Sequence, residues 1–182
     1  TAMNEPTVSI ETNPSDWNLL GNPYGLALDV EHLLGDNPGY HSTVYVYDNE
    51  LSAYRTHNGI TGDLDGGLIS PFSGFWILAD SAGSSFEFTE GSIVNSDSGA
   101  GRSTTENSTG SAVFTFHYQE YTSSVYLSFS PEGHINLDPA DARRLIPMEA
   151  RSHLVSMIHE SSKSLSINNL PSSLTSDAFY PM

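Results

Sequence analysis

The chain has 182 residues, no cysteine and a formal net charge of −16, from six Lys or Arg residues against 22 Asp or Glu residues. A single β-sandwich of this length buries enough apolar surface to need neither a disulfide nor a metal. Because phosphate groups are bound by clustered Lys and Arg, the charge argues against a nucleic-acid partner, and it disfavours anionic membranes for the same reason. No run approaches the roughly 20 apolar residues of a membrane-spanning helix, so we expect no membrane insertion.

Short apolar runs at period two, separated by turn-forming residues, predict strands throughout the first 90 residues. Between Val44 and Tyr47 the Val residues share one face and the Tyr residues the other. Asp48-Asn49-Glu50 is typical of a turn, which predicts a hairpin between the second and third strands. The dense apolar run from Gly74 onward predicts a strand that is buried on both faces. The five predicted strands span residues 16–20, 43–48, 51–56, 74–79 and 86–89.

Residues 91–110 consist mainly of Ser, Thr, Asn and Gly, which is typical of a long loop or a linker. Two strong strand patterns follow, at 112–120 and 124–130, and we expect them to pair antiparallel. Asp138 as an N-cap and Pro139 at the first helical position then predict a short helix over residues 139–146. Two further segments, 153–158 and 164–167, predict a closing hairpin.

These elements together predict an all-β fold: an antiparallel β-sandwich, jelly-roll-like, with one short helix. We expect residues 1–182 to form a single domain. The polar loop at 91–110 leaves open a subdivision into residues 1–90 and 111–182.

Three segments carry a family resemblance. The first is Trp17-Asn18-Leu19-Leu20-Gly21-Asn22-Pro23-Tyr24. The second has two parts, Val44-Tyr45-Val46-Tyr47-Asp48 and Ile69-Ser70-Pro71-Phe72-Ser73-Gly74-Phe75-Trp76-Ile77. The third is Leu165-Ser166-Ile167-Asn168-Asn169-Leu170-Pro171. In this order they resemble the β-rich region that precedes the C-terminal sorting domain in multidomain surface and secreted proteins exported by the type IX secretion system. The resemblance implies export, and hence an extracellular or cell-surface location. It implies no activity, because this region accompanies enzymes and adhesins alike.

The sequence contains no motif that identifies a catalytic residue. None of the seven histidines falls at H-x-H or H-x-x-x-H spacing, and G-x-S-x-G is absent. Gly62-Asp63-Leu64-Asp65-Gly66-Gly67 places the carboxylates of Asp63 and Asp65 among glycines, which suits a calcium loop with oxygen ligands. A polar hairpin turn explains the same residues equally well. We therefore expect no catalytic residue and no cofactor apart from an optional structural calcium ion.

The aromatic residues divide into a predicted core set and a predicted surface set. Large aromatic residues within strand patterns are expected to fill the core; these are Trp17, Trp76, Phe75, Phe114 and Phe116. Tyrosines near turns are expected to be exposed, where each ring offers a flat apolar face on which a sugar can stack. This ligand-binding set is Tyr24, Tyr40, Tyr54 and Tyr121.

We therefore expect a non-catalytic accessory domain of an exported protein that binds a glycan or another surface polymer and supports adhesion. One alternative is a structural subunit of an extracellular filament or surface layer, in which copies of the chain join through an open sheet edge. That edge would arise if the residues around Phe179-Tyr180 do not form a closing strand. The other alternative is a hydrolase fragment.

Overall fold

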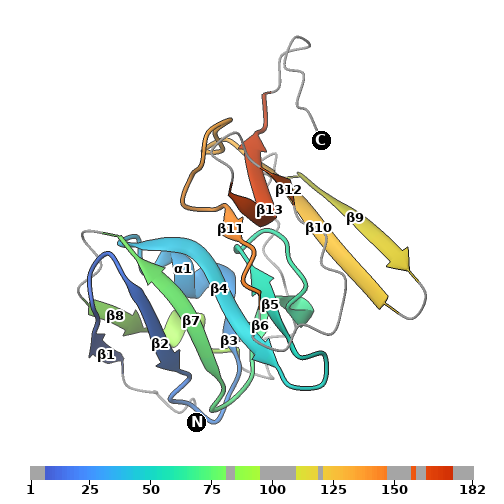
Figure 1. Cartoon of the computed structure of the whole chain (residues 1–182). Coiled ribbons are helices and arrows are strands. Elements are labelled where there is room, and N and C mark those ends of the chain that lie inside the picture. The colour runs from blue at the N-terminus through green and yellow to red at the C-terminus, as the bar shows by residue number, and fades with distance from the viewer. Residues whose placement is uncertain are drawn as a thin grey trace.

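The computed structural model of the chain describes residues 7–80, 85–94, 110–118, 121–146, 157–158 and 163–173, and its arrangement is drawn in Figure 1. The fold is all-β and sandwich-like, as predicted. The first half contains β1 (Val8–Glu11), β2 (Trp17–Gly21), β3 (Leu28–Asp29), α1 (Val30–Gly35), β4 (Tyr40–Asp48), β5 (Ala53–His57), the 3-10 turn η1 (Asp65–Gly67), β6 (Leu68–Ile69), β7 (Gly74–Ala79), β8 (Ser85–Phe88) and the 3-10 turn η2 (Glu90–Ser92). The second half contains β9 (Gly110–Tyr118), β10 (Tyr121–Ser130), β11 (Ala142–Arg143), β12 (Met157–Ile158) and β13 (Ser164–Pro171).

The central sheet has the strand order β2-β7-β4-β5, and all its pairs are antiparallel. The predicted hairpin is confirmed, with Tyr47 opposite Tyr54 across β4 and β5. Because side chains alternate along a strand, Val44 and Ile77 point to one face of the sheet and Tyr45 to the other. The first face packs on α1 and the β1–β8 pair, where a continuous apolar core is buried.

The second sheet has the order β11-β13-β10-β9, with β12 also paired to β13. The predicted antiparallel pair is confirmed, with Val125 of β10 opposite Phe114 of β9. β12 and β13 pair antiparallel, as the closing hairpin predicts, while residues 153–156 of that prediction lie outside the described residues. β10 and β13 pair parallel. The predicted antiparallel sandwich thus contains one parallel pair among the described strands, and a long connection joins these two strands, as parallel pairing requires.

The two sheets meet face to face. Tyr45 of the central sheet packs with Tyr126, Ala142 and Ile167 of the second sheet, and Trp17, Tyr54, Trp76 and Leu145 surround this contact. Beside it, Asn58 donates from Nδ2 to Ser128 Oγ at 3.0 Å and to the carbonyl of Ala140 at 3.1 Å. Apolar burial and buried hydrogen bonds thus join the first half of the chain to the second. The subdivision of the chain around residues 91–110 stays a prediction, since residues 95–109 lie outside the described residues.

The structure places the helix at a different position from the one that the sequence predicts. The expected helix at 139–146 is wrong: Asp138 accepts from the backbone N–H of Ala140 at 2.8 Å and begins a turn, and Ala142–Arg143 then pairs with β13 as β11. Strand pairing here overrides local helix propensity. The helix is α1, where Asp29 is the N-cap and accepts from His32 N at 3.1 Å.

The predicted aromatic core is right in part. Phe75 is fully buried and Trp17 and Trp76 are half-buried, but Phe114 and Phe116 are exposed, Phe116 by 51%. Their alternation places both rings on the face of β9 that points away from the central sheet, since Val113 is the residue opposite the inward-facing Tyr126. The expectation that they fill the core is therefore wrong.

Candidate functional site

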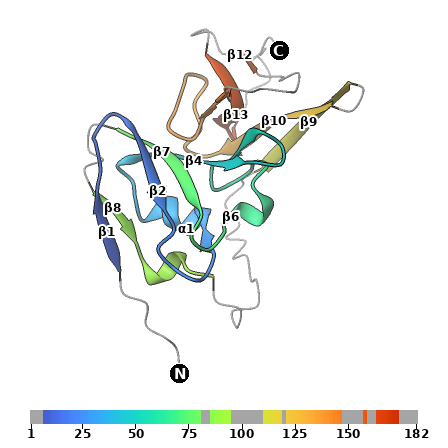
Figure 2. The ribbon, with the colours of Figure 1, turned by 60° about the horizontal axis from the view of Figure 1, so that its bottom comes forward.

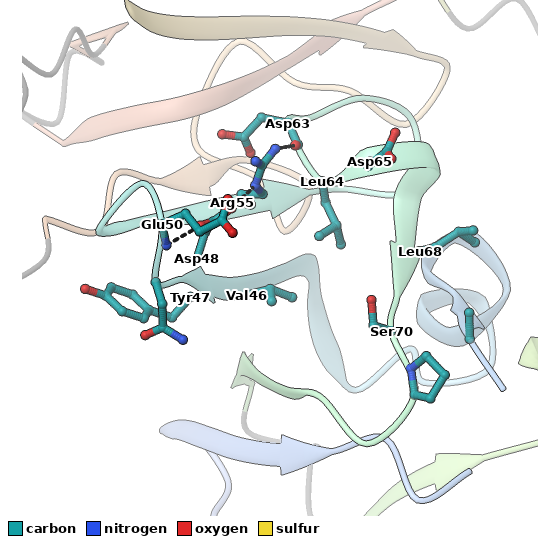
Figure 3. A pocket seen from close by; sticks show the side chains of 13 residues that line it. Val46, Tyr47, Asp48, Glu50, Arg55, Asp63, Leu64, Asp65, Leu68 and Ser70 are labelled. Carbon is teal, nitrogen blue, oxygen red and sulfur yellow. Dashed lines mark hydrogen bonds and ion pairs between the residues drawn. The ribbon is translucent and has the colours of Figure 1, made fainter. Parts of the chain in front are cut away.

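An open groove of about 840 Å³ lies at the end of the β4–β5 hairpin (Figure 3). It is formed by the β4–β5 turn, by the loop that follows β5, and by the turn between β6 and β7. Its lining combines one aromatic ring with carboxylates, an amide and a guanidinium group above an apolar floor. The lining residues are Ala27, Val46, Tyr47, Asp48, Asn49, Glu50, Arg55, Asp63, Leu64, Asp65, Leu68, Ser70 and Pro71.

Asp48 fixes the turn at one end of the groove. Its Oδ1 accepts from the backbone N–H of Glu50 at 2.8 Å and of Leu51 at 3.0 Å, and its Oδ2 accepts from Arg55 Nε at 2.7 Å. The hydrogen bond from Leu51 and the one from Arg55 lower the pKa of the Asp48 carboxyl, and the nearby Arg55 charge acts in the same direction. Asp48 is therefore an ionised group whose oxygens hold the turn together.

Asp63 holds the opposite side of the groove to the edge of β5. Its Oδ1 accepts from Thr56 N at 2.5 Å, and its backbone carbonyl accepts from Arg55 Nη1 at 3.0 Å. Arg55 thus spans the groove from Asp48 to Asp63, as the dashed lines of Figure 3 show. Burial raises the pKa of the Asp63 carboxyl, and the hydrogen bond from Thr56 offsets part of this effect.

Tyr47 supplies the aromatic surface of the groove. Its ring is 41% exposed, and it packs edge to face against Tyr54 with the ring centroids 5.2 Å apart. A ring buttressed in this way keeps its orientation while one side stays open to solvent. Nearby, the exposed Glu50 and Asp65 carboxylates and the Asn49 side chain offer hydrogen-bonding groups to whatever enters.

The four tyrosines predicted from the sequence to bind a ligand do not come together. Tyr24 and Tyr40 are 5% and 4% exposed, so their expected exposure is wrong. Both rings belong to the apolar core, and Tyr24 OH donates to the carbonyl of Phe88 at 3.0 Å. Tyr54 is half-buried behind Tyr47. Tyr121 begins β10, but its side chain lies outside the described residues.

The two predicted calcium ligands, Asp63 and Asp65, both line the groove, and the β4–β5 turn with Asp48 and Glu50 meets them there. Within the described ranges, however, no three His, Asp or Glu side chains converge in a way that holds a metal ion. Arg55 already places a positive charge among these carboxylates. A calcium site at Asp63 and Asp65 stays a prediction, because no third carboxylate of the described residues converges with these two.

Tyr47, Asn49 and Arg55 were not singled out from the sequence as site residues. Period-two alternation puts Tyr47 and Tyr45 on one face of the predicted strand, but the pairing of Tyr47 with Tyr54 and the loop that brings Asp63 to this hairpin are seen only in the structure. Among the described residues, no helix has the combined length and apolar character needed to cross a membrane. Comparisons with protein-family models, with curated proteins and with solved structures found no match for this chain.

Proposed function

We propose that the chain is a non-catalytic accessory domain of an exported surface or secreted protein, and that it binds a saccharide in the groove between Tyr47 and Asp65. The observation that carries this proposal is the lining of the groove: an exposed, buttressed tyrosine ring beside carboxylate and amide groups. A sugar ring stacks its C–H face on an aromatic ring while its hydroxyls bond to polar groups at the rim.

The charge of the groove narrows the class of sugar. Four carboxylates and one guanidinium line it, which gives a formal charge of −4 + 1 = −3. This charge repels uronic and sulfated sugars, whereas Glu50 and Asp65 can accept hydrogen bonds from hydroxyls or bind an ammonium group. Neutral and amino sugars are therefore the ligands that the groove suits.

Two of the four carboxylates, those of Asp48 and Asp63, are already engaged in structural hydrogen bonds, which argues against a catalytic role for them. Asp48 uses both oxygens to hold its turn and Arg55, and Asp63 accepts from the backbone of β5. A general acid or a nucleophile must be free to reach the reacting bond. Export and a surface location rest on the resemblance of the three sequence segments alone.

The proposal is tested by screening the purified chain and two variants on an array of neutral, amino and acidic glycans. We expect the wild-type chain to bind glycans of the first two classes. Tyr47→Ala should weaken binding about tenfold or more, as the loss of a central aromatic contact does. Leu19→Ala removes an even more exposed apolar side chain on β2, outside the groove, and should leave glycan binding unchanged. Binding that survives Tyr47→Ala, or that is confined to acidic glycans, contradicts the proposal.

A further inference from the structure

The outer edge of β9 differs from the rest of this acidic surface. The strands of the β9–β10 hairpin, residues 110–118 and 121–130, contain no Asp, Glu, Lys or Arg, although the chain carries 22 acidic residues. In the views of Figures 1 and 2 the hairpin extends away from the central sheet. Val113 is 52% exposed, and Phe114 and Phe116 are exposed on the opposite face. An edge strand of this kind, long, apolar and uncharged, readily pairs with a further strand.

The other edges of the described sheets are shorter than β9, and the edge at β5 is protected. At the opposite edge of the central sheet, β2 has five residues. Along β5, Thr56 N donates to Asp63 Oδ1, and the Thr56 carbonyl accepts from Asp63 N at 2.9 Å, so the following loop occupies this edge. The far edge of the second sheet consists of β11 and β12, which have two residues each. At nine residues β9 is the longest edge strand in the described part of the chain, and β10 is the strand with which it pairs.

The sequence of β9 is complementary to itself. When two copies of this strand run antiparallel about a two-fold axis at Thr115, Phe114 of one copy faces Phe116 of the other. Four Phe rings then share one face of the two-strand pair, and on the opposite face Val113 of one copy lies across from His117 of the other. No charged side chain enters the pair.

We propose that β9 is a dimerisation edge, and that its occupant is β9 of a second copy, paired antiparallel with Thr115 on the two-fold axis. An isologous pair of this kind closes on itself, since β9, the longest edge strand among the described residues, is used once in each copy. The product is a closed dimer and not a filament. This proposal is independent of saccharide binding, because no residue of β9 lines the groove.

Electrostatics gives the dimer a characteristic salt dependence. Each copy carries a formal charge of −16, so two copies repel at long range. Added salt screens that repulsion, with a Debye length of about 10 Å at 0.1 M. The contact itself is apolar and has no ion pair to lose. Dimerisation should therefore strengthen as salt is added, opposite to the behaviour of an interface built on ion pairs.

Sedimentation of the full 182-residue chain over a range of concentrations and salt provides the test. Because Thr115 faces itself across the axis, Thr115→Glu and Thr115→Lys should each weaken the dimer about fivefold or more. An equimolar mixture of these two variants should recover association, since unlike charges then meet. Thr122→Glu and Thr122→Lys are matched controls on β10, on the same face as Thr115 but one strand further in, and should leave the dimer unchanged.

A second readout does not depend on how well charged variants fold. The chain has no cysteine, so Thr115→Cys introduces a single thiol whose Cβ would lie about 5 Å from its symmetry mate. We expect oxidation to link Thr115→Cys into a covalent dimer much faster than Thr122→Cys. Monomers at every concentration and salt level, no recovery in the mixture, or equal cross-linking at both positions would overturn the proposal.

Discussion

The side chain of Asn169 is the centre of a buried polar network, and its removal tests how the second sheet is held together. Asn169 is buried on β13. Its Oδ1 accepts from Ser128 Oγ at 2.9 Å, and its Nδ2 donates to Ser130 Oγ and to Asp138 Oδ2, both at 3.1 Å. Asn169→Ala removes all three hydrogen bonds at once and leaves their partners buried.

The expected loss follows from the chemistry of these bonds. A hydrogen bond between neutral groups contributes about 1 kcal/mol, and one to a carboxylate about 1.5–3 kcal/mol. With two neutral bonds and one to Asp138, Asn169→Ala should lower the free energy of unfolding by about 4 kcal/mol. That is a large part of the stability of a domain of this size.

The neighbouring asparagine is the matched control. Asn168 lies on the same strand, but its Oδ1 is buried and has no hydrogen-bond partner among the described residues. Asn168→Ala removes an unsatisfied polar atom, so its effect should stay within about 1 kcal/mol of zero. Urea denaturation at neutral pH measures both variants. Losses of similar size for the two, or a loss below about 1 kcal/mol for Asn169→Ala, would refute the assignment of the network.

Three further predictions concern the groove and its turns. Burial raises the pKa of Asp63, so its ionisation costs stability as the pH rises from about 3.8 through the folded-state value, and Asp63→Asn should gain stability relative to wild type across that window. The pKa of Asp48 is lowered, so Asp48→Asn should lose stability above about pH 3.8 and converge with wild type in acid. Denaturation at several pH values checks both signs. Gly62→Ala should cost about 2 kcal/mol or more, since a Cβ there would lie 2.0 Å from the Thr56 carbonyl oxygen; an unchanged melting temperature would contradict the described turn. Phe72 has a positive φ of 58° and an exposed ring. Because glycine adopts this backbone conformation without strain, Phe72→Gly should leave stability unchanged or raise it by up to about 1 kcal/mol. A clear loss of stability in thermal denaturation would contradict this prediction and show that the ring packs on the fold.

Local patterns predicted most strands of this chain because strand alternation is a local property. The runs around Val44 and Val125 have period two, and each became a strand with the expected partner. The dense apolar run around Phe75 also became a strand, in the middle of the central sheet. The helix at 139–146 failed for the opposite reason. Asp138 and Pro139 satisfy the rules for a helix start, but pairing with β13 and the buried network around Asp138 decide the conformation there.

The candidate site was less predictable than the fold. Nearness to a turn does not decide exposure: Tyr24 and Tyr40 lie near turns, yet packing of the first half of the chain buries both rings. Phe114 and Phe116 look like core residues, but they lie on an edge strand. The groove itself joins Asp48 with Asp63, and only tertiary structure brings these two turns together.

Saccharide binding in the groove is tested most directly by an NMR titration of the labelled chain with the glycan that binds most strongly on the array. Backbone amide shifts that saturate and are confined to the groove, at Tyr47 to Glu50, Arg55 and Asp63 to Asp65, are the result expected for this site. Shifts confined to β9, or none at any glycan concentration, would contradict it.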